Sequence, residues 1–447
     1  MEIKQTEQLC RLVFGGKFGL ERETLRVTPQ GYLSQTPHPF PGNPHIDRDF
    51  CESQIEIISP ICTTISELYR AVECIDRETK EGLKKLNPPE YLWPFSNPPY
   101  VPSEAEIPVA KYAGELHHKE VYRNYLAEKY GKRKMLFCGI HFNYSYSDEF
   151  IRAAMATCGV TDEKAFKNIL YLQLSEKIEQ YSWLPVFLTA ASPVYDGSLF
   201  SDDACGVDGF AGESSVRSGE RGYWNDFVPI IDYQDMEHYT DSIDRYVKSG
   251  QLYSPSEWYT PVRIKPRGEN SLEALRENGA NHIELRMLDI NPLSHIGILQ
   301  EDLYFLHLFL VYLTFRGSLR FGEAEQIAAV ASHKASARYD AEHAVVTLNG
   351  EQFPLPEGAL RFLKEMESFF ITIGRKDVLP ILHEMQERCT TPEKRHCHRV
   401  YEQFHQNFVE KGLLLAQQYM EPNAADLKEV PITDKNRNEC RNCCSFL

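Results

Sequence analysis

The chain has 447 residues, of which 42% are hydrophobic and 25% charged, as in soluble globular proteins with a large buried core. A formal net charge of −16 leaves no basic excess, which excludes a general binder of nucleic-acid phosphates. The first residues include acidic side chains and no sustained apolar core, so a secretory signal is not expected. The most apolar run, from Leu303 to Phe315, is too short to span a membrane. We therefore expect a cytoplasmic protein with mainly reduced cysteines and no nucleic-acid or membrane partner.

Residues 1–17 predict a short helix, and the segment after it, GLERETLRV (Gly19 to Val27), predicts a strand. Glu21 and Glu23 lie two residues apart in this strand, so its alternation places both on one face. The core of a strand normally carries apolar side chains at such positions. The first strand is therefore unusual, because it presents two carboxylates on the same side.

A second acidic strand is predicted at DFCESQIEIISP (Asp49 to Pro60), with Asp49 leading into it. Alternation puts Glu52, Gln54 and Glu56 on one face. Two like charges about 4 Å apart repel by ~4 kcal/mol at an effective dielectric of about 20. Two strands with converging carboxylates therefore require a divalent cation, basic side chains or wide solvation.

Most of the remaining chain predicts helices separated by polar or proline-rich segments. Helical spacing of apolar side chains marks residues 64–86, 112–130, 161–190, 235–249 and much of the chain from 298. Six prolines make Asn87–Glu104 an extended loop. The segment 196–225 is rich in Gly, Ser and Asp and predicts a loop that faces the substrate.

Further strands are predicted at residues 135–147, 257–267 and 282–292. The first of them places His141 and Asn143 on one face, and the last places Glu284 and Arg286 on one face. Strands and helices do not alternate regularly along the chain. The sequence therefore predicts an α+β fold with a mostly antiparallel sheet.

The strands together supply a set of side chains that suit a metal ion: Glu21, Glu23, Asp49, Glu56, His141 and Glu284. Carboxylate-rich sets with one histidine favour hard ions such as Mg²⁺ or Mn²⁺. Several such ions beside arginines favour phosphoryl transfer from ATP, because the metals neutralise the developing charge. The residues alone thus indicate metal-assisted phosphoryl chemistry or hydrolysis.

Six motifs resemble, in order and approximate spacing, those of the bacterial glutamate–cysteine ligase family. They are GLERETLRV, DFCESQIEIISP, YLWPFSNPPY, GIHFNYS, SVRSGERGY and HIELRMLDINPLSHIGI. The resemblance covers much of residues 18–312. It implies a glutamine-synthetase-like fold, in which a curved, mostly antiparallel sheet is flanked by long helices. It also implies two or three Mg²⁺ ions, with Mn²⁺ as an alternative, around ATP and L-glutamate.

The resemblance also implies roles for individual residues. The six metal-binding candidates fall where the family places its metal ligands. Arg286 falls at an arginine that contacts phosphate, and Arg123 at a basic residue near the reacting groups. The residues that match the amino-acid substrate pocket are Arg217, Tyr223, Tyr122, Phe50, Leu126 and Tyr259. Met135 departs from the pattern, since some members carry Gln there, beside the cysteine site.

The implied activity is the ATP-dependent joining of the γ-carboxylate of L-glutamate to the amine of L-cysteine through γ-glutamyl phosphate, the first step of glutathione biosynthesis. Two alternatives stay open, namely a γ-glutamyl ligase for a different amine and a metal-dependent hydrolase or metal-binding protein.

One catalytic domain is expected over residues 1–420, compatible with a monomer, followed by a poorly ordered tail over residues 421–447 that contains cysteines. Cys51 and Cys138 are expected to be core residues, because alternation points them away from the acidic face. His396-Cys397-His398 is expected to be part of a basic helical stretch.

Overall fold

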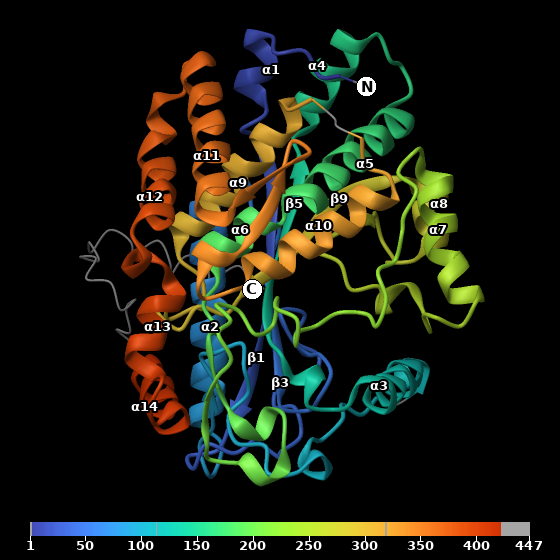
Figure 1. The fold of residues 1–447 in the computed structure, drawn as a ribbon. Helices are drawn as coiled ribbons and strands as arrows, with labels where there is room; N and C mark the ends of the chain where they lie inside the picture. Colours follow the sequence, from blue (N-terminus) through green and yellow to red (C-terminus); the bar gives the residue numbers. More distant parts are fainter. Residues whose placement is uncertain (1, 113, 318–319, 422–447) are drawn as a thin grey trace.

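Seven strands form one sheet at the centre of the computed structural model, which describes residues 2–112, 114–317 and 320–421 (Figure 1). The order along the sheet is β2 (Ile46–Arg48), β3 (Gln54–Ile58), β1 (Gly16–Val27), β5 (Gly139–Tyr146), β9 (Ala280–Asp289) and β8 (Val262–Pro266), and β4 (Tyr91–Leu92) pairs with β1. Every pairing in this sheet is antiparallel. The prediction of an α+β fold with a mostly antiparallel sheet is confirmed.

The strand register gives the sheet one polar and one apolar face. Directly paired residues of neighbouring strands have their side chains on the same side of a sheet. Strand β1 pairs Glu21 with His141 of β5 and Glu23 with Glu56 of β3. The alternate positions of β1 are buried: Leu20 is apolar, and Arg22, two residues on, pairs with buried Asp76. The predicted metal-binding side chains of three strands therefore lie on one face.

Three long helices cover the apolar face, namely α2 (Ile65–Lys84), α5 (Glu163–Tyr181) and α9 (Gln300–Phe315). On α9, the ring of His307 lies 4.9 Å from that of Phe18 on β1. Helix α9 is the predicted apolar run, and nearly all of its side chains are buried. On the polar face, Arg123 of α3 (His117–Tyr130) contacts Asp49, which leads into β3.

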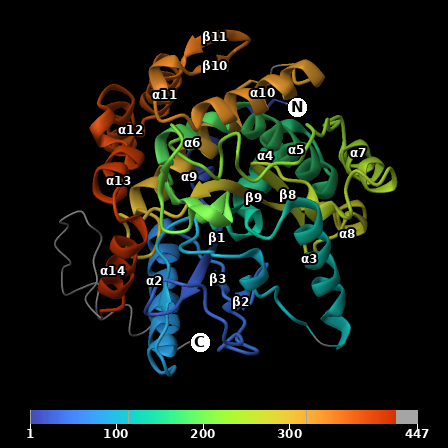
Figure 2. The same ribbon diagram turned by 60° about the horizontal axis from the view of Figure 1, so that its bottom comes forward.

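The remaining elements surround this core. The helices are α1 (Glu7–Leu12), α3 (His117–Tyr130), α4 (Asp148–Cys158), α6 (Trp183–Thr189), α7 (Met236–Lys248), α8 (Leu272–Asn278), α10 (Glu323–Ser336), α11 (Leu355–Thr372), α12 (Leu379–Thr390), α13 (His396–Phe404) and α14 (Phe408–Tyr419). Two short strand pairs join β6 (Val194–Asp196) to β7 (Asp208–Phe210) and β10 (Val345–Leu348) to β11 (Glu351–Pro354). Helix α3 projects from the body of the molecule in both views (Figures 1 and 2). Within the described residues, no helix has the length and apolar character needed to cross a membrane.

The second acidic strand is shorter than predicted. Strand β3 begins only at Gln54, because the chain turns just before it, where the Gln54 N–H donates to the Cys51 carbonyl over 2.9 Å. Helix α4 and edge strand β2 are not among the predicted elements. A single catalytic domain over residues 1–420 stays a prediction. The expected tail lies, from residue 422 onward, outside the described residues.

Candidate active site

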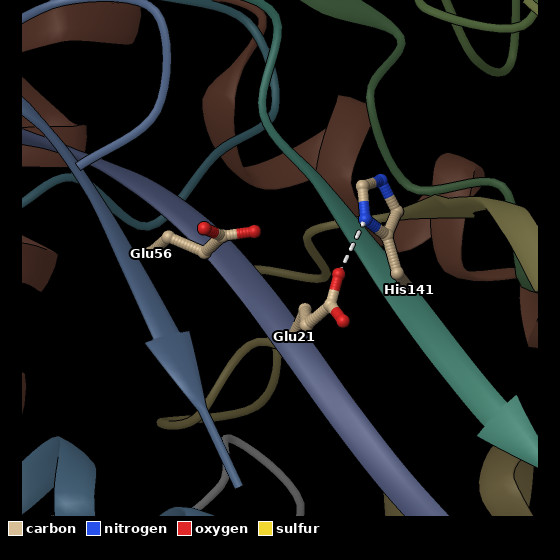
Figure 3. A group of neighbouring side chains, drawn as sticks. All are labelled: Glu21, Glu56 and His141. Atoms are coloured by element: carbon tan, nitrogen blue, oxygen red, sulfur yellow. Dashed lines mark hydrogen bonds and ion pairs between the residues drawn. The ribbon is translucent and has the colours of Figure 1, made fainter. Parts of the chain in front are cut away.

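The centre of the polar face is a group of three potential metal ligands from three adjacent strands (Figure 3). Glu21 of β1, Glu56 of β3 and His141 of β5 each offer one ligand atom, and these atoms all lie within 4.8 Å of one another. The His141 Nδ1 atom is 3.3 Å from Glu21 Oε2. Among the described residues, this is the one group of three or more such side chains close enough to share an ion.

Two more predicted ligands reach the same imidazole. Glu23 Oε1 lies 3.6 Å from His141 Nε2, and Glu284 Oε1 lies 3.3 Å from His141 Nδ1. The Gly139 N–H donates to Glu23 Oε2 over 2.8 Å, which fixes that carboxylate. The buried Nε2 atom of His141 has no hydrogen-bond partner within the described residues. The structure thus brings Glu21, Glu23, Glu56 and Glu284 together around His141, and their role as metal ligands stays a prediction.

The carboxylates of this cluster fall into two electrostatic groups. Burial and the nearby Glu21 and Asp49 raise the pKa of Glu56 well above its usual value. Burial also raises the pKa of Glu23, although His141 opposes the shift. For Glu284, in contrast, Arg286 and other cations outweigh burial and hold the pKa well below its usual range. The carboxylates of β1 and β3 therefore repel one another without enough positive charge nearby, and a metal ion bound there would reduce this repulsion.

Basic side chains supply that charge on the β8–β9 side. Arg286 Nη1 lies 2.7 Å from Glu284 Oε1, and Lys265 Nζ lies 2.8 Å from Glu284 Oε2. Arg263 of β8 is paired in register with Glu284 and so lies on the same face. Arg217 Nη2 donates to the backbone carbonyl of Arg286 over 2.8 Å. Lys265 and Arg263 are missing from the predicted site, although their i, i+2 spacing in a predicted strand points to a shared polar face.

The remaining predicted ligand, Asp49, lies at the rim of the cluster with Arg123. The Arg123 Nη2 atom is 3.6 Å from Asp49 Oδ1, and its Nε–H donates to the Asp49 carbonyl over 2.6 Å. The Asp49 side chain is 42% exposed, the most exposed of the five predicted ligands that form these ion pairs. The Arg123 guanidinium also stacks over Tyr112, with 4.8 Å between Cζ and the ring centroid. Arg123 is therefore positioned by α3 beside the acidic cluster.

A small pocket beside Arg286 contains several of the residues predicted to bind substrate. Arg217, Tyr223, Tyr259 and Arg286 all line it. The rings of Tyr223 and Tyr259 are 4.1 Å apart, and the Tyr223 hydroxyl lies 3.7 Å from the Met135 sulfur. Met135 therefore contacts Tyr223, which is one of the residues predicted to bind the amino-acid substrate.

Tyr122 approaches the same region from α3. Its ring stacks on Tyr253 at 5.6 Å, and burial raises its pKa, with Tyr223 contributing to the shift. The structure does not bring Phe50 and Leu126 to the polar cluster in the same way. Both are buried in the hydrophobic core, and Leu126 is the one buried residue of α3. Their roles at the substrate site stay predictions.

Glu257 is a structural residue of the site that the sequence analysis does not single out. It is fully buried and pairs with Lys129 Nζ at 2.5 Å, and it accepts a hydrogen bond from the Tyr130 hydroxyl at 2.7 Å. Its second oxygen accepts from the Tyr253 N–H at 2.5 Å. This carboxylate therefore ties the end of α3 to the segment that carries Tyr259. The sequence gives no signal for it, since a lone Glu before a strand resembles any surface residue.

The structure also accounts for Glu52. Its two carboxylate oxygens accept backbone hydrogen bonds from His38 at 3.1 Å and Lys111 at 2.8 Å, and Arg48 lies 3.4 Å away. Glu52 precedes β3 instead of lying in it, so the predicted face does not apply to it. Its contacts are those of a residue that holds two loops together.

The expectations for other reactive residues are confirmed. Cys51 and Cys138 are fully buried in the core, and burial raises the pKa of the Cys51 thiol to about 11. His396 lies in α13, where its Nε2 atom is 2.9 Å from buried Asp302. These contacts are those of structural residues.

Comparisons with known proteins agree with this geometry. A sequence profile of the family described as glutamate-cysteine ligase matches residues 2–253 and 228–335. The chain is 34% identical over 440 residues to a glutathione biosynthesis bifunctional protein GshAB of Listeria monocytogenes, covering 95% of this chain and 57% of that protein. It is 35% identical over 382 residues to the GshAB protein of Clostridium perfringens, covering 82% of this chain and 49% of that protein. The chain thus spans about half the length of these curated relatives.

Two solved structures share the fold. A bifunctional glutathione synthetase from Pasteurella multocida is 29% identical, with a TM-score of 0.79 over 92% of this chain and 53% of that chain. A glutamate–cysteine ligase from Francisella tularensis, in complex with AMP, is 19% identical, with a TM-score of 0.80 over 97% of this chain and 93% of that chain. The match of the profile to most of the chain, together with relatives above 30% identity, shows that the chain belongs to the glutamate–cysteine ligase family.

Proposed function

We propose that this protein is a ligase that joins the γ-carboxylate of L-glutamate to the amine of L-cysteine at the expense of ATP. The observation that carries the proposal is the carboxylate cluster around His141, with Arg286 and Arg217 beside it. Family membership supports the same activity, and one relative with this fold was solved in complex with AMP. The product, γ-glutamylcysteine, would enter glutathione biosynthesis.

The cluster also supports a requirement for magnesium, with two or three Mg²⁺ ions expected and Mn²⁺ as an alternative. Glu21, Glu23, Glu56, His141, Glu284 and Asp49 would hold these ions. Two observations fit them to this chain: the unpartnered Nε2 atom of buried His141, and the raised pKa of Glu56 among other carboxylates. When bound, the ions would neutralise the negative charge of the ATP phosphates and of the transferring phosphoryl group.

The proposed reaction has two steps, and different residues of the chain would act in each. In the first, the γ-carboxylate of glutamate attacks the γ-phosphorus of ATP, and ADP leaves. Arg286 lies with its guanidinium on the polar face and would stabilise the charge that develops on the transferred group. In the second, the amine of cysteine attacks the carbonyl of γ-glutamyl phosphate, phosphate leaves, and the amine loses a proton. Arg217, Tyr223 and Tyr259 would bind and orient the amino acids, since they line one pocket beside Arg286.

A second candidate is a γ-glutamyl ligase for a different amine. The observation that favours it is Met135, whose sulfur lies 3.7 Å from the Tyr223 hydroxyl. A Gln at this position would offer an amide to the second amino acid, and Met135 does not. A metal-dependent hydrolase is the candidate from another class, since it would use the same carboxylates. A cytoplasmic location and a monomeric state stay predictions.

The test is release of phosphate by the purified protein with ATP, glutamate and a panel of amines, followed by the mass of the product. The proposal predicts that all three substrates are needed, that cysteine is the preferred amine and that the product is γ-glutamylcysteine. A preference for another amine would establish the second candidate. Turnover without ATP or glutamate would contradict both ligases and favour the hydrolase.

A further inference from the structure

A second pocket adjoins the one that contains Arg286, and four residues line both: Trp224, Tyr259, Thr260 and Pro261. Its volume is about 130 Å³. This is close to the ~150 Å³ cavity that admits benzene in an engineered protein, so the pocket suits a ligand of only a few non-hydrogen atoms. None of the metal-binding candidates lines it. It is therefore distinct from the acidic cluster around His141.

Aromatic side chains form part of the wall of this pocket, and several of them are held in place. Trp224, Phe227, Tyr233 and Trp258 line it. The lining residue Gln326 of α10 accepts from the Ile231 N–H at 2.9 Å and donates to the Ile231 carbonyl at 2.8 Å, which fixes the segment that carries three of these rings. Both polar groups of Gln326 are thus occupied. The pocket offers π-faces that are formed before any ligand arrives.

The carboxylate of Glu179, near the end of α5, lines this pocket. The Thr260 hydroxyl donates to it, and within the described residues no other hydrogen bond or ion pair to this carboxylate is found. Burial raises the pKa of Glu179 to about 8. A carboxylate with one neutral donor and no cation leaves most of its acceptor capacity unused.

The other ionisable groups near the pocket do not neutralise Glu179. Lys334 lines the pocket, but its Nζ atom pairs with Glu220 at 3.0 Å and lies 5.4 Å above the Trp224 ring. Asp226 lines the exposed mouth and adds negative charge. Two tyrosines interact electrostatically with Glu179, namely Tyr233 and Tyr239 of α7. Both phenols stay neutral because burial raises their pKa. Glu176, one turn earlier on α5, adds a further carboxyl group.

We propose that this pocket binds a small organic cation, a primary or quaternary ammonium group on a body of a few carbon atoms. The aromatic faces attract the cation through their quadrupoles, and the Glu179 carboxylate pairs with it. An anion would be repelled by Asp226 and could not pair with Glu179, and a neutral ligand could only form a hydrogen bond with the Glu179 carboxyl group. The proposal goes beyond the ligase activity, because this pocket shares only Tyr259 with the proposed substrate-binding residues and contains none of the metal-binding candidates.

The cation is expected to displace a proton. Near pH 7 most of the Glu179 carboxyl is protonated in the empty pocket, since its pKa is about 8. Pairing with an ammonium ion favours the ionised form, so the carboxyl O–H bond breaks and the proton passes to the buffer. Affinity should therefore rise by roughly tenfold per pH unit below pH 8 and level off above it. Release of close to one proton per ligand is expected near pH 7.

The experiment is isothermal titration calorimetry of the whole protein with n-butylammonium and tetramethylammonium, each in two buffers of different ionisation enthalpy. Saturable binding with a dissociation constant of about 1 mM is expected for both cations. Butyrate and n-butanol, of similar size, should not bind. The variant Glu179→Gln should lose cation binding, whereas Glu176→Gln, which changes a half-buried carboxyl group one turn away and outside the pocket lining, should keep it.

Three results would overturn the proposal: no saturable binding of either cation, equal binding by Glu179→Gln, or binding of n-butanol as tight as that of n-butylammonium. The last result would identify a purely apolar pocket. If Glu179→Gln does not fold, the wild-type titrations decide, because binding without proton release or pH dependence would exclude Glu179. The assay needs no turnover, so its outcome is independent of whether the protein is a ligase.

Discussion

The replacement Glu56→Gln should make the metal-free protein more stable and at the same time remove its response to Mg²⁺. Glu56 lies opposite Glu23 in the strand register and close to Glu21, and its pKa is raised by burial and by these charges. A carboxyl group whose folded pKa exceeds its unfolded value lowers stability as pH rises through that interval. Glutamine has nearly the same shape and no charge, so it removes this penalty together with a proposed ligand.

The size of the effect follows from the distances in the cluster. Two charges separated by the 4.8 Å that bounds this group repel by about 3.5 kcal/mol at an effective dielectric of about 20, and by about 0.9 kcal/mol in water. Because Glu56 is partly exposed, we expect a gain of about 1–2 kcal/mol at pH 8. With an unfolding entropy of about 2.1 cal/mol/K per residue over about 420 residues, Tm rises by about 1–2 °C. Mg²⁺ at one hundred times its Kd should stabilise the wild type by about 2.7 kcal/mol, which reverses the order of the two proteins.

The assay is thermal unfolding at pH 6 and pH 8, in EDTA and in Mg²⁺. The wild type should gain more from Mg²⁺ at pH 8, where Glu56 is more fully ionised, and Glu56→Gln should gain much less. Glu52→Gln is the matched control, because Glu52 holds two backbone amides and lies outside the cluster. It should lower Tm in EDTA and leave the Mg²⁺ gain unchanged. A lower Tm of metal-free Glu56→Gln, or a full Mg²⁺ gain in that variant, would refute the reasoning.

Three further changes test other parts of the structure. Glu284→Gln leaves Arg286 without its 2.7 Å partner and removes a proposed ligand, so phosphate release should fall by a factor of about 100 or more while the circular dichroism spectrum is kept; turnover within threefold of wild type would remove Glu284 from the site. Met135→Gln should change KM for the amine by about threefold or more and leave KM for ATP unchanged in steady-state kinetics, since this side chain meets the amino-acid pocket; equal changes in both constants would argue against that position. Asp302→Asn removes the carboxylate 2.6 Å from fully buried Arg388, which keeps Glu384 at 2.9 Å, and should cost about 3 kcal/mol in urea unfolding; a loss below about 1 kcal/mol would contradict this.

Alternation in the strands was sufficient to predict the polar face. The i, i+2 spacing of Glu21 and Glu23 needs no tertiary information, and the structure keeps it. Which strands become neighbours is a different matter. That His141 lies opposite Glu21 depends on the pairing of β1 with β5, more than one hundred residues apart, and the sequence reaches it only through the family resemblance.

The parts that the sequence does not predict share a cause. Glu52 leaves the predicted strand because a turn at Cys51 delays β3, and a turn of this kind has no Gly or Pro to mark it. Lys265 joins the site only because β8 pairs with β9 in a register that puts it beside Glu284. The isolated carboxylate of Glu179 becomes unusual only when loops from distant parts of the chain close over it. Each depends on long-range packing, which local patterns do not contain.

The most direct test of the central claim follows the oxygen atoms of the γ-carboxylate. If this protein activates glutamate as γ-glutamyl phosphate, one γ-carboxylate oxygen must leave with the phosphate when the amine attacks. Turnover of glutamate labelled with ¹⁸O in the γ-carboxylate, with ATP and cysteine, should therefore give phosphate that carries one ¹⁸O atom per molecule of γ-glutamylcysteine. Unlabelled phosphate would contradict the account, because it would mean that ATP is hydrolysed by water on the polar face of the sheet.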